Sequence, residues 1–301
     1  MNYSGAEYAC VQGWGIFDGP SDQTMVNGLL SWHVHLLELG LNEDCILGIN
    51  GVNPAYAGAN YMGAIQNFVN LLHANGIYTR LTIYWAAAGT QLATGQPPLL
   101  DADHAPAALQ VIAQYFGNDQ QTLIGLQEEP HDISWACWKN GGSSCSLGYT
   151  ALGMQSALGD YRAAGGTNVV TAPGIDYANN LQQWLAYKPS DPLNQLMASQ
   201  DIYGNNTCGN STCLNAYTGP VAQNVPVLLA EYGETYDGSS CANTSTSDIV
   251  GWADAHGVSY GAWTWNTWGA CSTLSLISSF NGTIDSGNYP HFVHDHMVAL
   301  P

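Results

Sequence analysis

The chain has 301 residues and is strongly acidic, because 23 aspartates and glutamates against 4 lysines and arginines give a formal net charge of −19. Such a surface repels phosphate backbones and anionic lipid, which argues against nucleic acid or a membrane as partner and favours a neutral substrate. The sequence holds no apolar run of about 18 residues and begins without the charged and apolar regions of a signal peptide, so neither a membrane span nor a leader is expected. We expect a monomer.

The cysteine content indicates an oxidising compartment. None of the 8 cysteines has the tandem spacing of a zinc site, and their even number favours disulfides. Two local pairs, Cys137 with Cys145 and Cys208 with Cys213, are expected to close short loops. The sequence therefore predicts a secreted, extracellular protein.

Short apolar, β-branched runs alternate with helical patterns along the whole chain, which is typical of a parallel sheet built from βα units. The expected strands, in chain order, are 8–14, 34–41, 77–84, 122–128, 167–172, 197–203, 226–231 and 259–265. Between the second and third, apolar residues recur at helical spacing from Met62 to Leu72, and Gly76 follows as a stop. Because no linker divides the chain, we predict one (β/α)₈ TIM barrel domain over residues 1–301, with an eight-stranded parallel core.

Working residues of such a barrel lie at the carboxyl ends of its strands. The residues expected there are Trp14, Glu38, Asn42, Glu43, Tyr84, Trp85, Glu128, Glu129, Asp201, Tyr203, Glu231, Trp263 and Trp265. Buried carboxylates are costly unless they are paired or used, so this set predicts a site. Neighbouring strand residues face opposite ways, so only one of Glu128 and Glu129 is expected to face the pocket squarely.

Two carboxylates on different strands can cleave a glycoside, one protonating the leaving oxygen and the other attacking the sugar; a gap of about 5 Å between them gives retention of configuration. Aromatic side chains then serve as platforms for sugar rings. We expect such a pair of carboxyl groups to face one pocket here.

Several motifs carry a resemblance to a known family. "GWGIFDGPSDQ", "LNEDCILGINGVNPAYAGANY", "EEPHD", "AEYGE" and "WTWNTWG" resemble family 5 of the glycoside hydrolases, a family of retaining (β/α)₈ barrels that includes cellulases and endoglucanases. The resemblance covers nearly the whole chain. It implies an O-glycosyl hydrolase acting on β-glucan, without a cofactor or a metal.

The same resemblance assigns roles to particular residues. Glu129, followed by Pro130, matches the acid/base glutamate, and Glu231 matches the nucleophile. Tyr203 matches the tyrosine that hydrogen-bonds the nucleophile. Trp263, or as the weaker match Trp265, corresponds to the tryptophan beneath the sugar.

Other positions depart from the family pattern, as in an engineered or diverged member. Glu38 stands where the family has an arginine, Glu128 where it has an asparagine that binds the sugar 2-hydroxyl, and Asp201 where it has a histidine. Gln200 replaces an aromatic residue and Tyr84 a histidine. Clustered acids raise one another's pKa values, so the sequence predicts a rebuilt and impaired site.

Two other readings stay open. In one, a carboxylate among Glu38, Glu128, Asp201 and Glu231 acts as a general base on a flat, non-sugar aromatic substrate, in a Kemp-type ring opening. In the other, the barrel is not catalytic and binds a sugar, or holds a hard cation such as Ca²⁺ in its ring of carboxylates. Arg80 either enters the barrel to neutralise an acid such as Glu38 or lies at its solvent end. The scattered histidines, among them His104, are interpreted as structural or surface residues.

Overall fold

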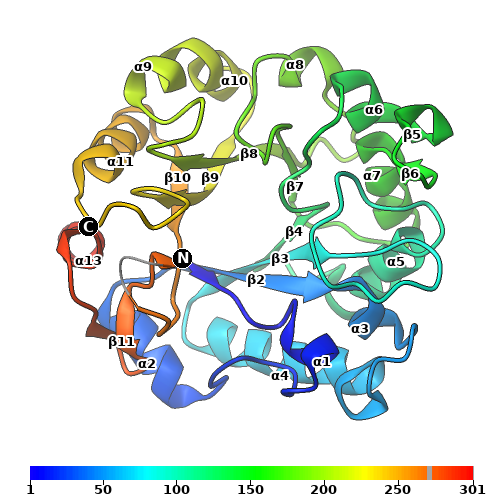
Figure 1. Cartoon of the computed structure of the whole chain (residues 1–301), viewed down its shortest axis with the longest axis horizontal. Coiled ribbons are helices and arrows are strands. Elements are labelled where there is room, and N and C mark those ends of the chain that lie inside the picture. The colour runs from blue at the N-terminus through cyan, green and yellow to red at the C-terminus, as the bar shows by residue number, and fades with distance from the viewer. Residues whose placement is uncertain (270–272, 301) are drawn as a thin grey trace.

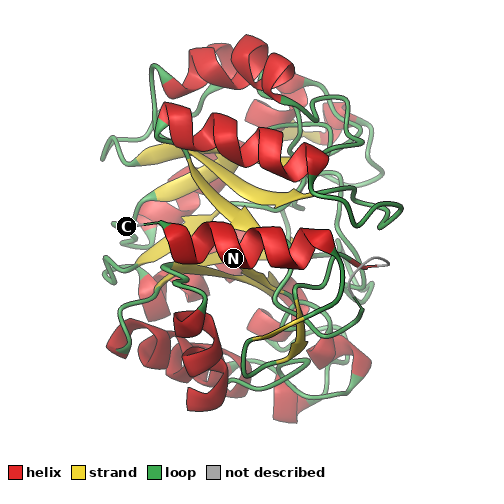
Figure 2. Cartoon of the chain, turned by 90° about the vertical axis from the view of Figure 1, so that its left-hand side faces the viewer, coloured by secondary structure: helices red, strands yellow, loops and turns green. Residues whose placement is uncertain are grey.

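The structure is a computed structural model that describes residues 1–269 and 273–300. Its centre is a sheet of eight parallel strands in the order β1-β2-β3-β4-β7-β8-β9-β10, surrounded by helices (Figures 1 and 2). The strands are β1 (Asn2–Tyr3), β2 (Leu36–Asn42), β3 (Tyr78–Trp85), β4 (Thr122–Gly125), β7 (Val170–Pro173), β8 (Leu196–Tyr203), β9 (Val227–Gly233) and β10 (Ser259–Ala262). The predicted TIM barrel is therefore confirmed as a nearly closed barrel.

Asn2 bridges the seam between the first and last strands. Its side-chain amide donates to the carbonyl oxygens of Ala230, at 2.9 Å, and of Ala262, at 3.3 Å. Its own carbonyl oxygen accepts from the backbone N–H of Trp265 at 2.7 Å. Because side chain and backbone both reach across, a two-residue strand is enough to fill the first position of the barrel.

The helices form the outer layer. They are α1 (Ala9–Gln12), α2 (Gln23–Ser31), α3 (Glu43–Leu47), α4 (Ala59–Ala74), α5 (Ala105–Phe116), α6 (Trp135–Asn140), α7 (Met154–Ala163), α8 (Trp184–Tyr187), α9 (Ser211–Cys213), α10 (Gly219–Ala222), α11 (Thr244–His256) and α13 (Asn288–Ala299). The loops contain short helical turns at Pro54–Tyr56, Ser143–Cys145 and Leu214–Thr218. They also contain two small antiparallel strand pairs, β5 (Gly141–Gly142) with β6 (Ala151–Leu152) and β11 (Ile277–Ser279) with β12 (Thr283–Ile284). The helix predicted around 62–72 is α4, which Gly76 follows at φ 79°. None of the helices in the described ranges is long and apolar enough to cross a bilayer.

The first predicted strand is wrong. Residues 8–14 contain α1, which ends at Gln12 and is followed by Gly13 at φ 76°, and the strand itself lies earlier, at Asn2–Tyr3. A short apolar run does not distinguish helix from strand. The other seven strands lie within a few residues of their predicted positions.

The two predicted local disulfides are present. Cys137 bonds Cys145 and Cys208 bonds Cys213. A third disulfide joins Cys10 of α1 to Cys45 of α3 and so ties the N-terminal segment to the helix after β2. Cys241 is also disulfide-bonded, and Cys271 lies outside the described residues.

Candidate active site

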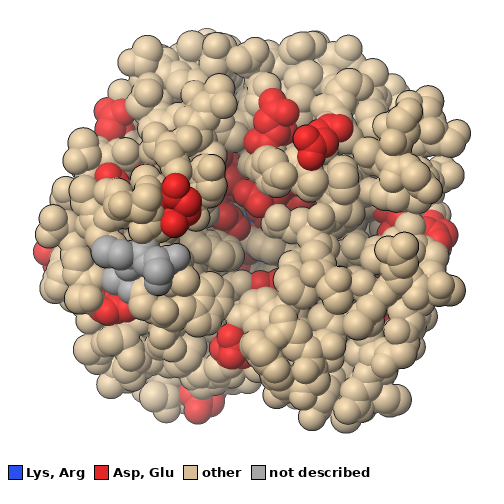
Figure 3. All heavy atoms as spheres, in the orientation of Figure 1, with Lys and Arg blue, Asp and Glu red and all other residues tan. Residues whose placement is uncertain are grey.

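A cavity of about 830 Å³ opens where the strands end. Its wall is built from strand ends and the loops after them: Glu7, Tyr84, Trp85, Gln96, Glu129, Asp176, Tyr177, Asn179, Asn180, Gln182, Tyr203, Asn205, Asn206, Thr207, Cys208, Tyr217, Glu231, Tyr236 and Trp263. Figure 3 shows a hollow in the middle of this face in which acidic side chains gather. The pocket therefore combines carboxyl groups with aromatic rings and amides.

Glu129 reaches the pocket from the turn after β4. Its backbone lies in the left-handed region at φ 44°, an uncommon conformation for a non-glycine residue that reorients the chain just before Pro130. Burial, followed by the nearby charge of Asp201, raises the pKa of Glu129 to about 8, although a hydrogen bond with Gln96 opposes the shift. A pKa near 8 favours the protonated form of the Glu129 carboxyl at neutral pH.

Glu231, on β9, is held by two tyrosines. Tyr84 donates a hydrogen bond to Glu231 Oε1 at 2.7 Å, and Tyr203 donates to Oε2 at 2.6 Å. Burial and the charges of Asp201 and Glu129 raise the pKa of Glu231 well above its usual range, while both tyrosines act in the opposite direction. The tyrosines fix the orientation of the carboxyl group and favour its ionised form.

Glu128 is buried beside Arg80 and, unlike Glu129, does not line the pocket. Arg80 is itself fully buried; its Nη1 is paired with Glu38 and is 3.5 Å from Glu128 Oε2, and its Nε donates to Thr171 at 3.0 Å. Glu38 and Arg80 are register partners on β2 and β3, which places both side chains in one layer. Of the two positions expected for Arg80, the structure shows the one inside the barrel, neutralising Glu38.

Asp201 connects the interior carboxylates to the pocket. It is the register partner of Glu231 across a β-bulge, and its Oδ1 accepts from the Glu231 backbone N–H at 3.1 Å. Burial raises the pKa of Asp201 to about 6, against the lowering effects of a hydrogen bond from Glu128 and the charge of Arg80. Oxygens of Glu128, Asp201 and Glu231 lie within 4.8 Å of one another, close enough to share protons or a cation.

The residues expected to bind substrate fall into two groups. Tyr84, Tyr203 and Trp263 line the pocket. Trp265, Gln200 and Trp14 do not line it. Trp265 is fully buried against Trp32, and Gln200 is buried with hydrogen bonds to Asn179 and Thr218. Trp14 is 62% exposed and lies beside Tyr8. Trp14 follows a helix instead of a strand, which is why it misses the strand ends.

The pocket also contains residues that sequence reasoning did not assign to it. Glu7, in the loop after β1, lines it and is buried, with hydrogen bonds from Ser4 and from the Gly5 N–H; burial raises the pKa of Glu7 to about 7. Placing the first strand at 8–14 hid this residue, because Glu7 then preceded the strand. Gln96, which contacts Glu129, lies in a long loop that offered no periodic signal.

Comparison with known proteins identifies the family. Residues 19–269 match the model of the cellulase family, glycosyl hydrolase family 5. The chain belongs to this family. The manganese dependent endoglucanase Eg5A of Phanerodontia chrysosporium is 33% identical over 69 residues, a segment that spans 23% of this chain and 15% of that protein.

Solved structures share the fold at low identity. XacCel5A, solved in complex with cellopentaose, superposes with a TM-score of 0.72 at 17% identity, covering 98% of this chain and 97% of its own. The catalytic domain of the endoglucanase Cel5A (E5) of Thermobifida fusca superposes with a TM-score of 0.66 at 14% identity, covering 99% and 90%. These likenesses establish the barrel architecture.

Proposed function

We propose that the chain is a retaining β-glycosidase of endoglucanase type, with Glu129 as the acid/base and Glu231 as the nucleophile. The observation that carries the proposal is that both glutamates line one pocket, Glu129 from the turn after β4 and Glu231 from β9, and that two tyrosines hold Glu231. Trp263 and the other rings of the wall supply platforms for sugar rings. A β-glucan is the substrate class we infer.

The reaction needs opposite protonation states in the two glutamates. Glu129 donates a proton to the leaving glycosidic oxygen while ionised Glu231 attacks the anomeric carbon, and Glu129 then deprotonates the water that releases the sugar. The raised pKa of Glu129, about 8, suits the first step. The raised pKa of Glu231 disfavours the ionised form that must attack the sugar, so we expect slow turnover. The rate should depend on the protonation states of Asp201 and Glu128, which lie next to Glu231.

The test is hydrolysis of a chromogenic β-cellobioside by the full chain and by Glu129→Gln and Glu231→Gln. Removing a positioned acid or base costs about 10²- to 10⁴-fold in rate. Glu128→Asn, which places an amide where the resembled family pattern has one, should preserve or improve turnover. Activity that persists in both glutamine variants would remove both assigned roles.

A second activity is favoured by one observation, the presence of several buried carboxyls with raised pKa values beside an aromatic pocket. A carboxylate deprived of water is a stronger base, and a ring on the wall can stack on a flat substrate. We propose that such a carboxylate can catalyse a Kemp-type ring opening, for which 5-nitrobenzisoxazole is the probe substrate. Turnover on this compound that disappears in Glu231→Gln or Asp201→Asn, with none on the cellobioside, would favour general-base catalysis over sugar cleavage.

We also propose that the chain works outside the cytosol. The disulfides Cys10–Cys45, Cys137–Cys145 and Cys208–Cys213 support this, because such bonds persist in oxidising compartments. Activity that survives a reductant able to open all of them would weaken the inference.

A further inference from the structure

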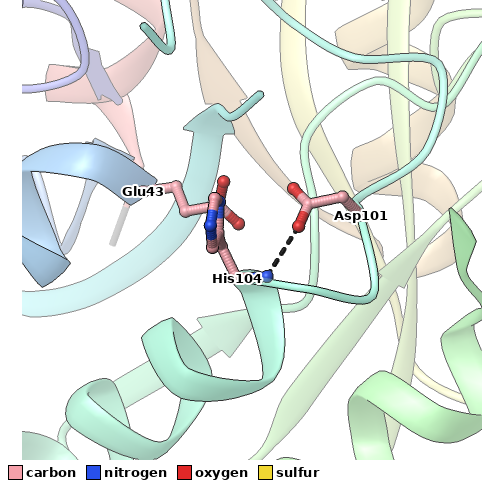
Figure 4. Close-up of side chains that lie close together, drawn as sticks. All are labelled: Glu43, Asp101 and His104. Carbon is pink, nitrogen blue, oxygen red and sulfur yellow. Dashed lines mark hydrogen bonds between the residues drawn. The ribbon is translucent and has the colours of Figure 1, made fainter. Parts of the chain in front are cut away.

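A second cluster of metal-ligating side chains lies where α3, the loop before α5 and the start of α5 meet (Figure 4). Glu43 is the first residue of α3, Asp101 lies in the loop, and His104 immediately precedes α5. One ligand atom of each lies within 4.8 Å of the others. None of the three lines the catalytic pocket.

Two oxygens of this cluster are buried and accept from no backbone, amide, hydroxyl or cationic donor in residues 1–269 and 273–300. Glu43 is fully buried and Asp101 is 1% exposed, yet within the described part of the chain no such donor reaches Glu43 Oε1 or Asp101 Oδ2. The Glu43 and Asp101 carboxyls lie close enough to share a side-chain hydrogen bond when one of them is protonated. Buried acceptors that face one another are costly unless a proton or a cation lies between them.

The backbone holds both carboxyls in place through their remaining oxygens. The Ala87 N–H donates to Glu43 Oε2 at 3.3 Å, and the His104 N–H donates to Asp101 Oδ1 at 2.7 Å, the bond drawn in Figure 4. The free oxygens are therefore positioned by contacts that an ion would leave intact. The His104 side chain is 22% exposed, which gives an ion access from solvent.

We propose that Glu43, Asp101 and His104 form a binding site for a divalent transition-metal ion such as Zn²⁺ or Mn²⁺. Two carboxylates balance the charge of the ion, and an imidazole nitrogen favours transition metals over Ca²⁺ and Mg²⁺, which prefer oxygen ligands throughout. Asp103, whose Oδ2 is 3.9 Å from His104 Nε2, adds a third acidic group at the edge of the site.

The ion would brace the loop between β3 and α5. This loop also carries Gln96, which contacts Glu129, and Pro97, whose carbonyl oxygen accepts from the Gln127 side chain at 3.1 Å. An ion joining the loop to α3 would therefore restrict a segment that forms part of the pocket wall. Its role is structural, and the site stands independently of the proposed sugar cleavage.

The experiment measures the melting temperature of the full, chelator-treated chain with Zn²⁺, Mn²⁺, Mg²⁺ or Ca²⁺, together with calorimetric titration of Zn²⁺. An ion that binds only the folded chain raises its melting temperature. We expect an increase of a few degrees with Zn²⁺ and Mn²⁺, little change with Mg²⁺ or Ca²⁺, and one Zn²⁺ bound at this site. Glu43→Gln and His104→Asn should each weaken Zn²⁺ binding at least about ten-fold.

Two matched variants separate this site from others. His73→Asn removes a histidine that pairs with the single carboxylate of Asp119, and Asp201→Asn breaks the carboxylate cluster of the pocket; both should leave the Zn²⁺ effect unchanged. No stabilisation by Zn²⁺ or Mn²⁺, or binding that survives Glu43→Gln and His104→Asn but is lost in Asp201→Asn, would overturn the proposal. If Glu43→Gln does not fold, His104→Asn, with its partly exposed ring, decides the question.

Discussion

Tyr203 Oη donates a 2.6 Å hydrogen bond to Glu231 Oε2, while Tyr84 Oη contacts the other oxygen of the same carboxyl at 2.7 Å. The Glu231 carboxyl therefore has a fixed orientation at the pocket wall. Because both contacts donate, they lower the pKa of Glu231 and act against the burial and the acidic neighbours that raise it. The balance between these effects sets the pH range in which the proposed nucleophile is ionised.

Tyr203→Phe should shift that balance. Losing one donor raises the pKa of Glu231 further, so the acid limb of the kcat/KM profile on a β-cellobioside should move to higher pH. Hydrogen bonds to charged groups contribute about 1.5–3 kcal/mol, so we expect roughly a ten- to hundred-fold loss at neutral pH. Tyr236→Phe, on an exposed tyrosine of the same wall, is the control and should leave the profile in place. An acid limb that stays put or moves downward in Tyr203→Phe would contradict the assignment.

Asp201→Asn should move both limbs of the profile to lower pH. The Asp201 charge raises the pKa values of Glu129 and Glu231, while an asparagine oxygen can still accept from the Glu231 N–H. The matched control is Asp176→Asn, which removes a carboxylate from the pocket rim without touching this cluster. The measurement is the pH profile of kcat/KM. Limbs that do not move in Asp201→Asn would show that the charge of Asp201 does not govern the pKa values of Glu129 and Glu231.

Strand periodicity predicted most of the barrel, because seven of its eight strands are apolar runs of ordinary length flanked by turn signals. The position of the first strand was not predicted, because the two residues Asn2 and Tyr3 are too few to show an alternating pattern. Their place in the sheet depends on hydrogen bonds from the Asn2 side chain to β9 and β10, which form only in the folded chain. Tertiary contacts decide such a case.

The carboxylates of the site were visible in the sequence, but their partners were not. Strand position alone did not show that Glu38 pairs with Arg80, which depends on the register of β2 and β3. Nor did it show that Glu129 lines the pocket while Glu128 does not, in a turn where the Glu129 backbone is left-handed. For Trp265 the sequence predicted substrate binding, but this tryptophan packs on Trp32 in the core. Residue type and spacing do not determine which side of the wall a ring occupies.

Arg80→Leu should destabilise the fold strongly, because it leaves Glu38 buried without its cation. Breaking a buried pair costs about 3–5 kcal/mol, whereas replacing both partners by apolar residues is often far less harmful. We therefore expect Glu38→Leu combined with Arg80→Leu to recover much of the loss. Urea unfolding of the single and double variants measures both effects. A loss below about 1 kcal/mol in Arg80→Leu, the range of a solvent-exposed pair, would contradict the burial of this contact.

Stability should fall as the pH rises through the pKa values of the buried acids. Folding raises the pKa of Asp201 to about 6, of Glu7 to about 7 and of Glu129 to about 8. The folded chain thus retains protons that the unfolded chain releases, so the stabilisation is complete below the ordinary carboxyl pKa of about 4 and is lost progressively up to about pH 8. The urea midpoint should decline over that window, and Glu7→Gln should remove roughly 3 kcal/mol of the pH dependence, since one pKa unit corresponds to about 1.4 kcal/mol. The partly exposed Asp285→Asn serves as control and should keep the full decline. A midpoint that stays constant or rises between about pH 5 and 8 would show that these acids are already ionised in the folded chain.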